Sequence, residues 1–254
     1  MRSLISAELL KLRSTRSAWI PLAAAVAAAV LAVVANTSAA GHGGNPPLSP
    51  AALPDLLRAS GGQLVDGAVL LAWIVLSAGE FRYRTSVTTF LGEPNRLRVV
   101  SAKLAAAALT GAAVGLLAEA FSAATSAAAL SVHHVPLAWD QPAVLGAVAA
   151  VPLLAALYGV LGVGLGLLLR NTAAAVGLAL VWAFVVEGIL PALTHQPGIV
   201  RWLPEAAANA VLHSTPPAAL PAGVALAVLA GYAAVLAGAG AALTARREIT
   251  TAPG

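Results

Sequence analysis

The chain has 254 residues, of which only 9% are charged and 59% are hydrophobic, and its mean hydropathy is +0.87. Soluble globular proteins carry about 25% charged residues, so this chain has too few polar side chains to cover a globule. The composition excludes a soluble enzyme, a nucleic-acid-binding domain and a disordered chain, and it predicts an integral membrane protein. The absence of cysteine excludes disulfides, thiolate metal sites and cysteine nucleophiles.

Six apolar stretches predict an all-α polytopic membrane protein. About 20 apolar residues cross a bilayer, and a lipid-exposed backbone must satisfy its hydrogen bonds within a helix. The expected organisation is an N-terminal segment (1–17), a transmembrane domain (18–243) and a tail (244–254). The six stretches cover approximately residues 18–35, 64–78, 104–132, 143–169, 172–190 and 220–243.

Lysine and arginine are divided unevenly between the two predicted sides. Twelve of the fourteen basic residues lie on the side that holds both termini and the second loop, and only Arg58 and Arg201 lie on the other. Cytoplasmic loops of membrane proteins carry such an excess. We therefore expect both termini in the cytoplasm, and the net charge of +4 needs no nucleic-acid partner to explain it.

The N-terminal segment 1–17 predicts an amphipathic helix. Met1, Ile5, Leu9 and Leu12 recur at helical spacing, and basic residues flank or oppose this apolar stripe. Such a helix lies in the lipid headgroup layer with its cations toward anionic lipid. The alternative is a positively charged flank that only orients the first transmembrane helix.

The second loop, 79–103, predicts a docking element for a soluble partner. Residues 85–91 carry a small apolar face at helical spacing, and residues 92–95 predict a turn. A short amphipathic helix between two membrane helices can fill a groove on a partner. The alternative is a solvated basic loop that fixes topology, but Glu80 and Glu93 favour docking, because mixed charges give a contact specificity.

These residues also carry a resemblance. Gly79-Glu80-Phe81-Arg82, followed by Thr85, Pro94, Arg96 and Lys103, resembles the loop between the second and third helices of ABC-2-type permeases. These permeases are the membrane subunits of bacterial ABC exporters whose ATPases are separate chains. The opening ELLKLRSTRS, residues 8–17, is similar to the elbow helix that begins such subunits, and the six-helix topology agrees along the whole chain.

The resemblance implies a permease in the bacterial plasma membrane that forms the substrate path as a homodimer or with a related permease. It implies no cofactor in this chain, and an ABC ATPase subunit that binds ATP and Mg²⁺. The chain itself lacks the glycine-rich phosphate-binding sequence of such ATPases. The residues expected to couple the two subunits are Glu80, Arg82, Arg84, Phe90, Glu93 and Arg96.

Acidic residues within the predicted spans supply a second hypothesis. Glu119 lies near the middle of the third stretch, where an ionised carboxylate facing lipid costs several kcal/mol. It is expected to face a cavity or another subunit, or to be protonated, as a substrate contact, a proton site or a buried structural hydrogen bond. Asp66 and Glu187 lie nearer the outer helix ends, where water is expected to reach them.

The alternative function is therefore a secondary transporter driven by an ion gradient, with Glu119 as the proton carrier. A non-transporting membrane scaffold or sensor is a third possibility. No hydrolase motif is visible, so catalysis by this chain is not expected.

Two local patterns add detail. Residues 201–213 predict a short helix on the outer side, before the last span. Gly111 with Gly115, and Gly162 with Gly166, have the spacing that lets membrane helices pack closely. In a glycine-rich chain this spacing is only a weak indication.

Overall fold

The computed structural model describes residues 1–14, 16–60, 63–83, 89, 91–194, 197–213 and 220–246, and the regular structure within these residues is entirely helical. The main helices are α1 (Arg2–Ser14), α2 (Arg16–Ala39), α3 (Leu53–Ser60), α4 (Gln63–Arg82), α6 (Arg96–Val132), α7 (Pro142–Leu169), α8 (Thr172–Val181), α9 (Gly188–Thr194), α10 (Pro197–Val200), α11 (Pro204–His213) and α12 (Ala222–Arg246). A 3₁₀ turn, η1 (Pro50–Ala52), precedes α3, and a π-helical segment, η2 (Trp182–Glu187), joins α8 to α9.

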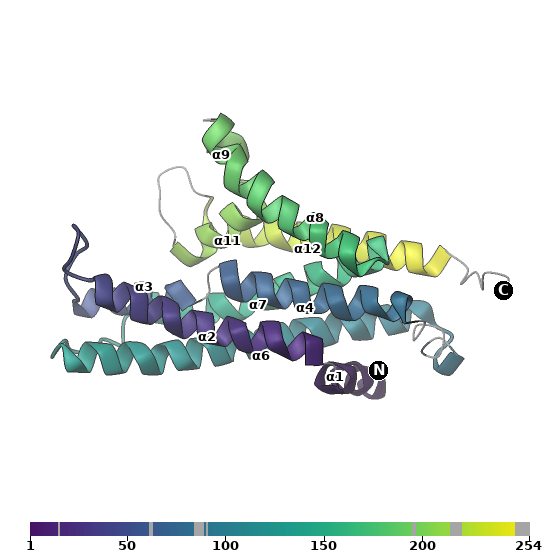
Figure 1. Cartoon of the computed structure of the whole chain (residues 1–254), viewed down its shortest axis with the longest axis horizontal. Coiled ribbons are helices and arrows are strands. Elements are labelled where there is room, and N and C mark those ends of the chain that lie inside the picture. Colours follow the sequence, from purple (N-terminus) through teal and green to yellow (C-terminus); the bar gives the residue numbers. More distant parts are fainter. Residues whose placement is uncertain are drawn as a thin grey trace.

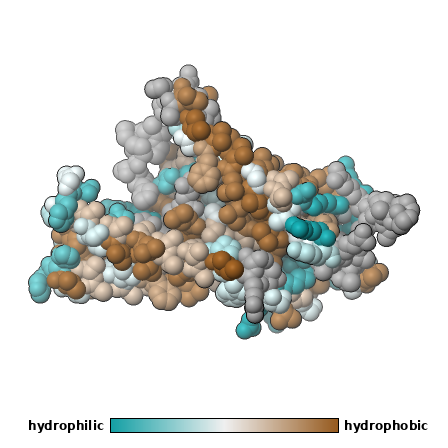
Figure 2. All heavy atoms as spheres, in the orientation of Figure 1, coloured by the Kyte–Doolittle hydropathy of each residue, from teal (hydrophilic) through white to brown (hydrophobic). Residues whose placement is uncertain are grey.

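The long helices α2, α4, α6, α7 and α12 run side by side, and α7 contacts α4, α6 and α12 (Figure 1). Helix α1 lies across one end of this bundle, the end at which α12 also finishes; we call this the α1 end. Helix α3 lies toward the opposite end, the α3 end. On the face seen in Figure 2, hydrophobic side chains dominate the middle and hydrophilic ones gather toward the two ends.

Five helices in the described residues are long and apolar enough to cross a membrane: α2, α4, α6, α7 and α12. They overlap five of the six predicted stretches, so the all-helical, multi-pass character is confirmed. The stretch 172–190 differs because its apolar helix, Thr172–Glu187, is shorter than the five candidate spans and ends in the π-helical η2. Helices α8, η2 and α9 nevertheless follow one another without a break along 172–194.

The predicted loop 79–103 is helical at both ends. Helix α4 continues to Arg82, and α6 begins at Arg96, because the Asn95 side chain caps it by accepting a hydrogen bond of 3.1 Å from the backbone N of Arg98. The connection is therefore shorter than the sequence indicated. Most of the helix expected over 85–91 lies outside the described residues.

Glycines allow the neighbours of α7 to approach its backbone. A Cβ added to Gly159 would lie 2.7 Å from the Ala107 carbonyl oxygen of α6, and one on Gly164 would lie 2.7 Å from the Leu236 carbonyl carbon of α12. Gly115 and Gly166, from the two predicted pairs, would likewise clash with Pro152 and Ser77. The weak glycine signal therefore corresponds to real close packing.

Gly159→Ala should destabilise the bundle by about 1–3 kcal/mol, because the added methyl has no room against the α6 backbone. Gly231→Ala on α12 is the matched control, since a Cβ there meets nothing within 4 Å. Its effect should stay within about 0.5 kcal/mol. Thermal unfolding of both variants in one detergent tests this, and equal midpoints would contradict the packing argument.

Candidate functional site

The α1 end brings together charged residues from three helices. Glu8 and Lys11 lie three residues apart on one face of α1, Glu80 is near the end of α4, and Lys103 is near the start of α6. Helix α1 is held there by its apolar stripe, because Ile5, Leu9 and Leu12 pack on the core formed by α2, α4, α6 and α7. Met1, the fourth residue of that predicted stripe, is 58% exposed.

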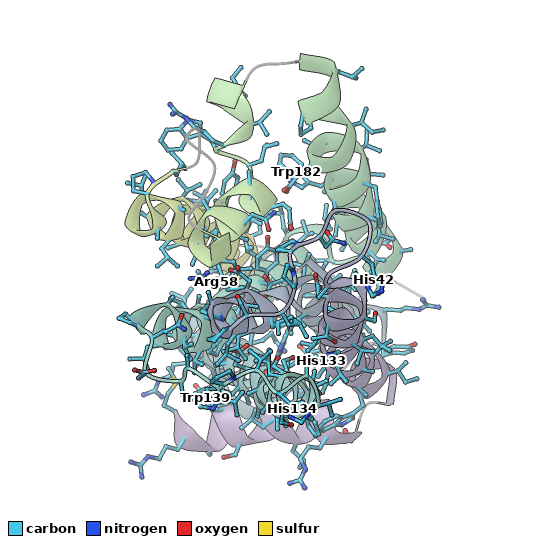
Figure 3. The ribbon with its side chains drawn as sticks, turned by 90° about the vertical axis from the view of Figure 1, so that its left-hand side faces the viewer. His42, Arg58, His133, His134, Trp139 and Trp182 are labelled. Atoms are coloured by element: carbon cyan, nitrogen blue, oxygen red, sulfur yellow. The ribbon has the colours of Figure 1, made fainter. Side chains whose placement is uncertain are left out.

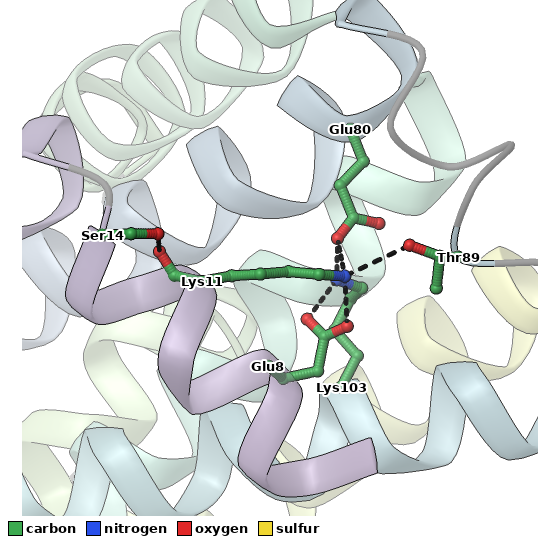
Figure 4. A network of polar contacts seen from close by, with 6 residues as sticks. All are labelled: Glu8, Lys11, Ser14, Glu80, Thr89 and Lys103. Atoms are coloured by element: carbon green, nitrogen blue, oxygen red, sulfur yellow. Dashed lines mark hydrogen bonds and ion pairs between the residues drawn. The ribbon is translucent and has the colours of Figure 1, made fainter. Parts of the chain in front are cut away.

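The four side chains form a closed ring of ion pairs (Figure 4). Lys103 Nζ lies 2.6 Å from Glu8 Oε2 and 2.8 Å from Glu80 Oε1. Lys11 Nζ lies 2.8 Å from Glu8 Oε1 and 2.8 Å from Glu80 Oε1. It also donates a longer hydrogen bond, 3.4 Å, to Thr89 Oγ1 of the connection between α4 and α6. We call these five residues the α1 network.

The members of the α1 network differ in how far their side chains are exposed to solvent. The Lys103 side chain is 2% exposed and that of Glu8 6%, whereas that of Lys11 is 35% exposed. Burial alone would lower the pKa of the Lys11 ammonium, but the Glu80 and Glu8 carboxylates outweigh this and the pKa is raised. Two carboxylates facing two ammonium groups leave the network neutral, which is the condition for burying charge.

Two arginines hold the last turn of α12 at the same end. Arg96 Nη1 donates to the Thr244 carbonyl oxygen at 3.2 Å, and Arg170 Nη2 donates to the Leu243 carbonyl oxygen at 3.2 Å. The Arg170 guanidinium also lies 4.7 Å from the centre of the Phe81 ring of α4. Cations satisfy the free carbonyls that end a helix, so α4, α6, α7 and α12 are tied together here.

Four of the six expected coupling residues are described, and these four do not share one surface. Glu80 and Arg96 turn inward, to the α1 network and to α12. Arg82 is exposed, with its guanidinium 5.7 Å from the Tyr83 ring centre. Glu93 Oε1 accepts a hydrogen bond from the backbone N of Asn95 at 3.3 Å, and its Oε2 lies 3.8 Å from Arg98 Nη1. The remaining two, Arg84 and Phe90, lie outside the described residues.

Glu8, Lys11 and Lys103 were not expected to form a site. By sequence, Glu8 and Lys11 belong to the predicted interfacial helix, and Lys103 belongs to the basic second loop. A signal was nevertheless present, because Glu8 is a lone carboxylate in a basic segment and lies three residues before Lys11. Glu80 and Lys103, which complete the ring, come from distant parts of the chain, and nothing in the sequence pairs them with Glu8 and Lys11.

A hollow of about 290 Å³ opens beside the network, between α1 and residues 89–93. Apolar Leu4 and Ala7 of α1 and Val99 and Ala102 of α6 line part of it, and Lys11 reaches its edge.

The intramembrane acids behave differently from one another. Glu119 is 3% exposed and shares a buried face of α6 with Ser122 and Ser126, in keeping with the expectation that it avoids lipid. Asp66 is 2% exposed, so the expectation that water reaches it is wrong. The first turn of α4 lies against α7, which extends well beyond it toward the α3 end.

Comparison of the chain with models of known protein families finds no matching family, and comparison with curated proteins finds no similar sequence.

Lys103→Met should destabilise the protein by about 3–5 kcal/mol, because it leaves the Glu8 and Glu80 carboxylates buried beside a single cation. Arg98→Met is the control: its side chain is 63% exposed and its contact with Glu93 is long, 3.8 Å. An exposed pair contributes at most about 1 kcal/mol. Thermal unfolding and yield of the two variants test the difference, and similar losses in both would count against a structural network.

Proposed function

We propose that this chain is the permease subunit of an ATP-driven ABC exporter in a bacterial plasma membrane. Two permease chains, identical or related, form the substrate path. A separate ATPase, which binds ATP and Mg²⁺, docks on the α1 end. In this proposal the α1 end is cytoplasmic, and α1 lies in the headgroup layer as an elbow helix. Residues 172–190 form a further span between α7 and α12, which brings the number of spans to six.

The observation that carries the proposal is the α1 network. It joins an interfacial helix (α1), the helix before the connection (α4) and the helix after it (α6), and Lys11 also contacts Thr89 within the connection. Force applied to the connection reaches all three helices together. An ATPase that closes on ATP could thereby tilt the membrane helices as a unit and change the side from which the substrate path opens.

Charge distribution supports the proposed orientation. The α1 end carries the basic residues of α1, the end of α4, the start of α6 and the ends of α7 and α12. Arg58, on α3, and Arg201, before α11, lie outside this group. An excess of cations on one side is typical of the cytoplasmic face.

Purification of the tagged chain in mild detergent should recover a stoichiometric ATP-binding subunit with ATPase activity. Mass spectrometry and an ATPase assay of the purified sample measure this. Recovery of the chain alone, in normal yield and without ATPase activity, would contradict the proposal.

Two substitutions separate docking from coupling. Arg82→Glu reverses an exposed charge beside the connection, so it should reduce recovery of the ATPase while the yield and unfolding temperature of the chain stay unchanged. Glu80→Gln weakens the α1 network from within, so it should retain the ATPase but uncouple ATP hydrolysis from transport.

Asp55→Asn is the matched control for both measurements, because Asp55 lies on α3 and its side chain is 74% exposed. It should leave recovery and coupling unchanged. Wild-type recovery with Arg82→Glu together with wild-type coupling in Glu80→Gln would overturn the assigned docking site.

The burial of Glu119 favours a second candidate function, transport driven by a proton gradient. Glu119→Gln should then abolish transport in vesicles, while depletion of ATP should leave transport unchanged. Loss of transport on ATP depletion, with activity retained in Glu119→Gln, would leave the exporter as the remaining proposal.

A further inference from the structure

The chain leaves the helix bundle after α8. Helix α8 is seated by Ala175 and Ala179, which are buried against Ile74 of α4 and Leu165 of α7. Residues 182–194, which form η2 and α9, follow without such a seat. None of their described side chains is buried, and α9 stands clear of the bundle (Figure 1). Hydrophobic side chains dominate the visible face of this projecting segment (Figure 2). We call residues 182–194 the arm.

A carboxylate ties the arm to α11. Glu187, the last residue of η2, accepts a hydrogen bond of 2.6 Å at Oε2 from the backbone N of Glu205. This N–H belongs to the first turn of α11, where backbone donors have no acceptor within their own helix. Leu203, the residue before α11, has no side-chain oxygen that could accept it. Glu187 therefore caps α11 from outside, and the positive N-terminal end of the helix favours a carboxylate there.

The π-helical form of η2 brings a second donor to the same carboxylate. Trp182 Nε1 donates to Glu187 Oε1 at 2.6 Å, and Figure 3 shows Trp182 pointing from its helix toward the α11 side. The two residues are five apart in sequence, so an α-helix would point them about 140° away from each other. The i→i+5 repeat of a π-helix places them on one face. Both carboxylate oxygens are thereby engaged, and bonds this short are typical of an ionised acceptor.

Helix α11, on the other side of this contact, has the apolar seat that the arm lacks. Ala207, Ala208, Ala210 and Leu212 are buried in the cluster that α11 shares with α7 and α12. Segment η2 contacts α11 in addition to its chain neighbours α8 and α9. The bond between Glu187 and the backbone of Glu205 therefore joins a projecting segment to a fixed one.

We propose that Glu187 is a latch that holds the arm on α11, and that the arm moves away from α11 when this latch opens. Lipid surrounds the apolar side chains of the arm equally well in either position, so it gives them no hydrophobic reason to pack. The two hydrogen bonds of Glu187 favour the latched position. The latch lies away from the α1 end (Figure 1), so it would operate with or without the proposed ATPase.

Distance measurements can test the latch, because the chain has no cysteine that would compete for a spin label. Labels at Phe184→Cys on the arm and Val235→Cys on α12, both exposed positions, report where the arm lies. Leu178→Cys on α8, paired with Val235→Cys, is the reference, since α8 is seated on the bundle. Pulsed electron spin resonance of the full chain in nanodiscs, diluted with unlabelled chain, gives the distribution of label-to-label distances for each pair.

With Glu187 intact, each pair should give one main distance. Glu187→Ala should raise the fraction of the arm pair at a second distance by at least about fivefold, the ratio expected for the loss of one helix cap. The reference pair should stay unchanged. Trp182→Phe removes the indole N–H but keeps an aromatic ring, so it should raise that fraction less. If Glu187→Ala gives too little protein, an unchanged arm pair in Trp182→Phe would contradict the latch.

Glu205→Ala is the matched control. It removes a neighbouring carboxylate but keeps the backbone N–H that Glu187 accepts, so the arm pair should give the same distribution as in the parent. An arm pair that ignores Glu187→Ala, or that shifts as much in Glu205→Ala, would overturn the proposal. A reference pair that shifts together with the arm pair would also overturn it, because the whole segment from α8 onward would then have lost its seat.

Discussion

Close approach to α7 is the constraint on which the rest of the structure depends. Lipid gives helices no hydrophobic reason to associate, so close van der Waals packing and polar contacts must hold them together. Gly159 and Gly164 let the backbones of α6 and α12 meet α7 directly, and Gly166 admits Ser77 of α4. This packing brings the ends of these helices close together. The polar and charged side chains at those ends are then buried against one another, so their charges and hydrogen bonds must be compensated.

The two ends of α4 differ in how far they meet that requirement. At the α1 end, two carboxylates face two ammonium groups, so the charges cancel within the α1 network. In the first turn of α4, Asp66 is 2% exposed, its Oδ1 has no hydrogen-bond partner, and no salt bridge reaches it within the described residues. A balanced network of ion pairs can stay buried without a net charge, whereas a buried carboxyl oxygen without a partner leaves a polar group uncompensated.

The sequence predicts those features of the fold that a single segment determines by itself, such as a helix or its apolar face. The apolar stretches gave the positions of the five long helices, and the stripe on α1 gave the face that packs. Lys103 shows where such reasoning ends, because its partner Glu8 lies 95 residues away and nothing local pairs them. Asp66 was misjudged for a related reason: its place near a helix end indicated access to water, but α7 extends past that end and buries it. Contacts between distant segments depend on helix packing, which hydropathy alone does not encode.

Helix α4 connects the α1 network to Asp66. Glu80 lies near its last turn and Asp66 in its first, a separation of about 21 Å along a helix that rises about 1.5 Å per residue. Between them Trp73 is 1% exposed, and its Nε1 donates to Thr110 Oγ1 of α6 at 3.0 Å. In the proposed coupling, a displacement that the ATPase imposed at Glu80 would therefore act against this buried contact between α4 and α6.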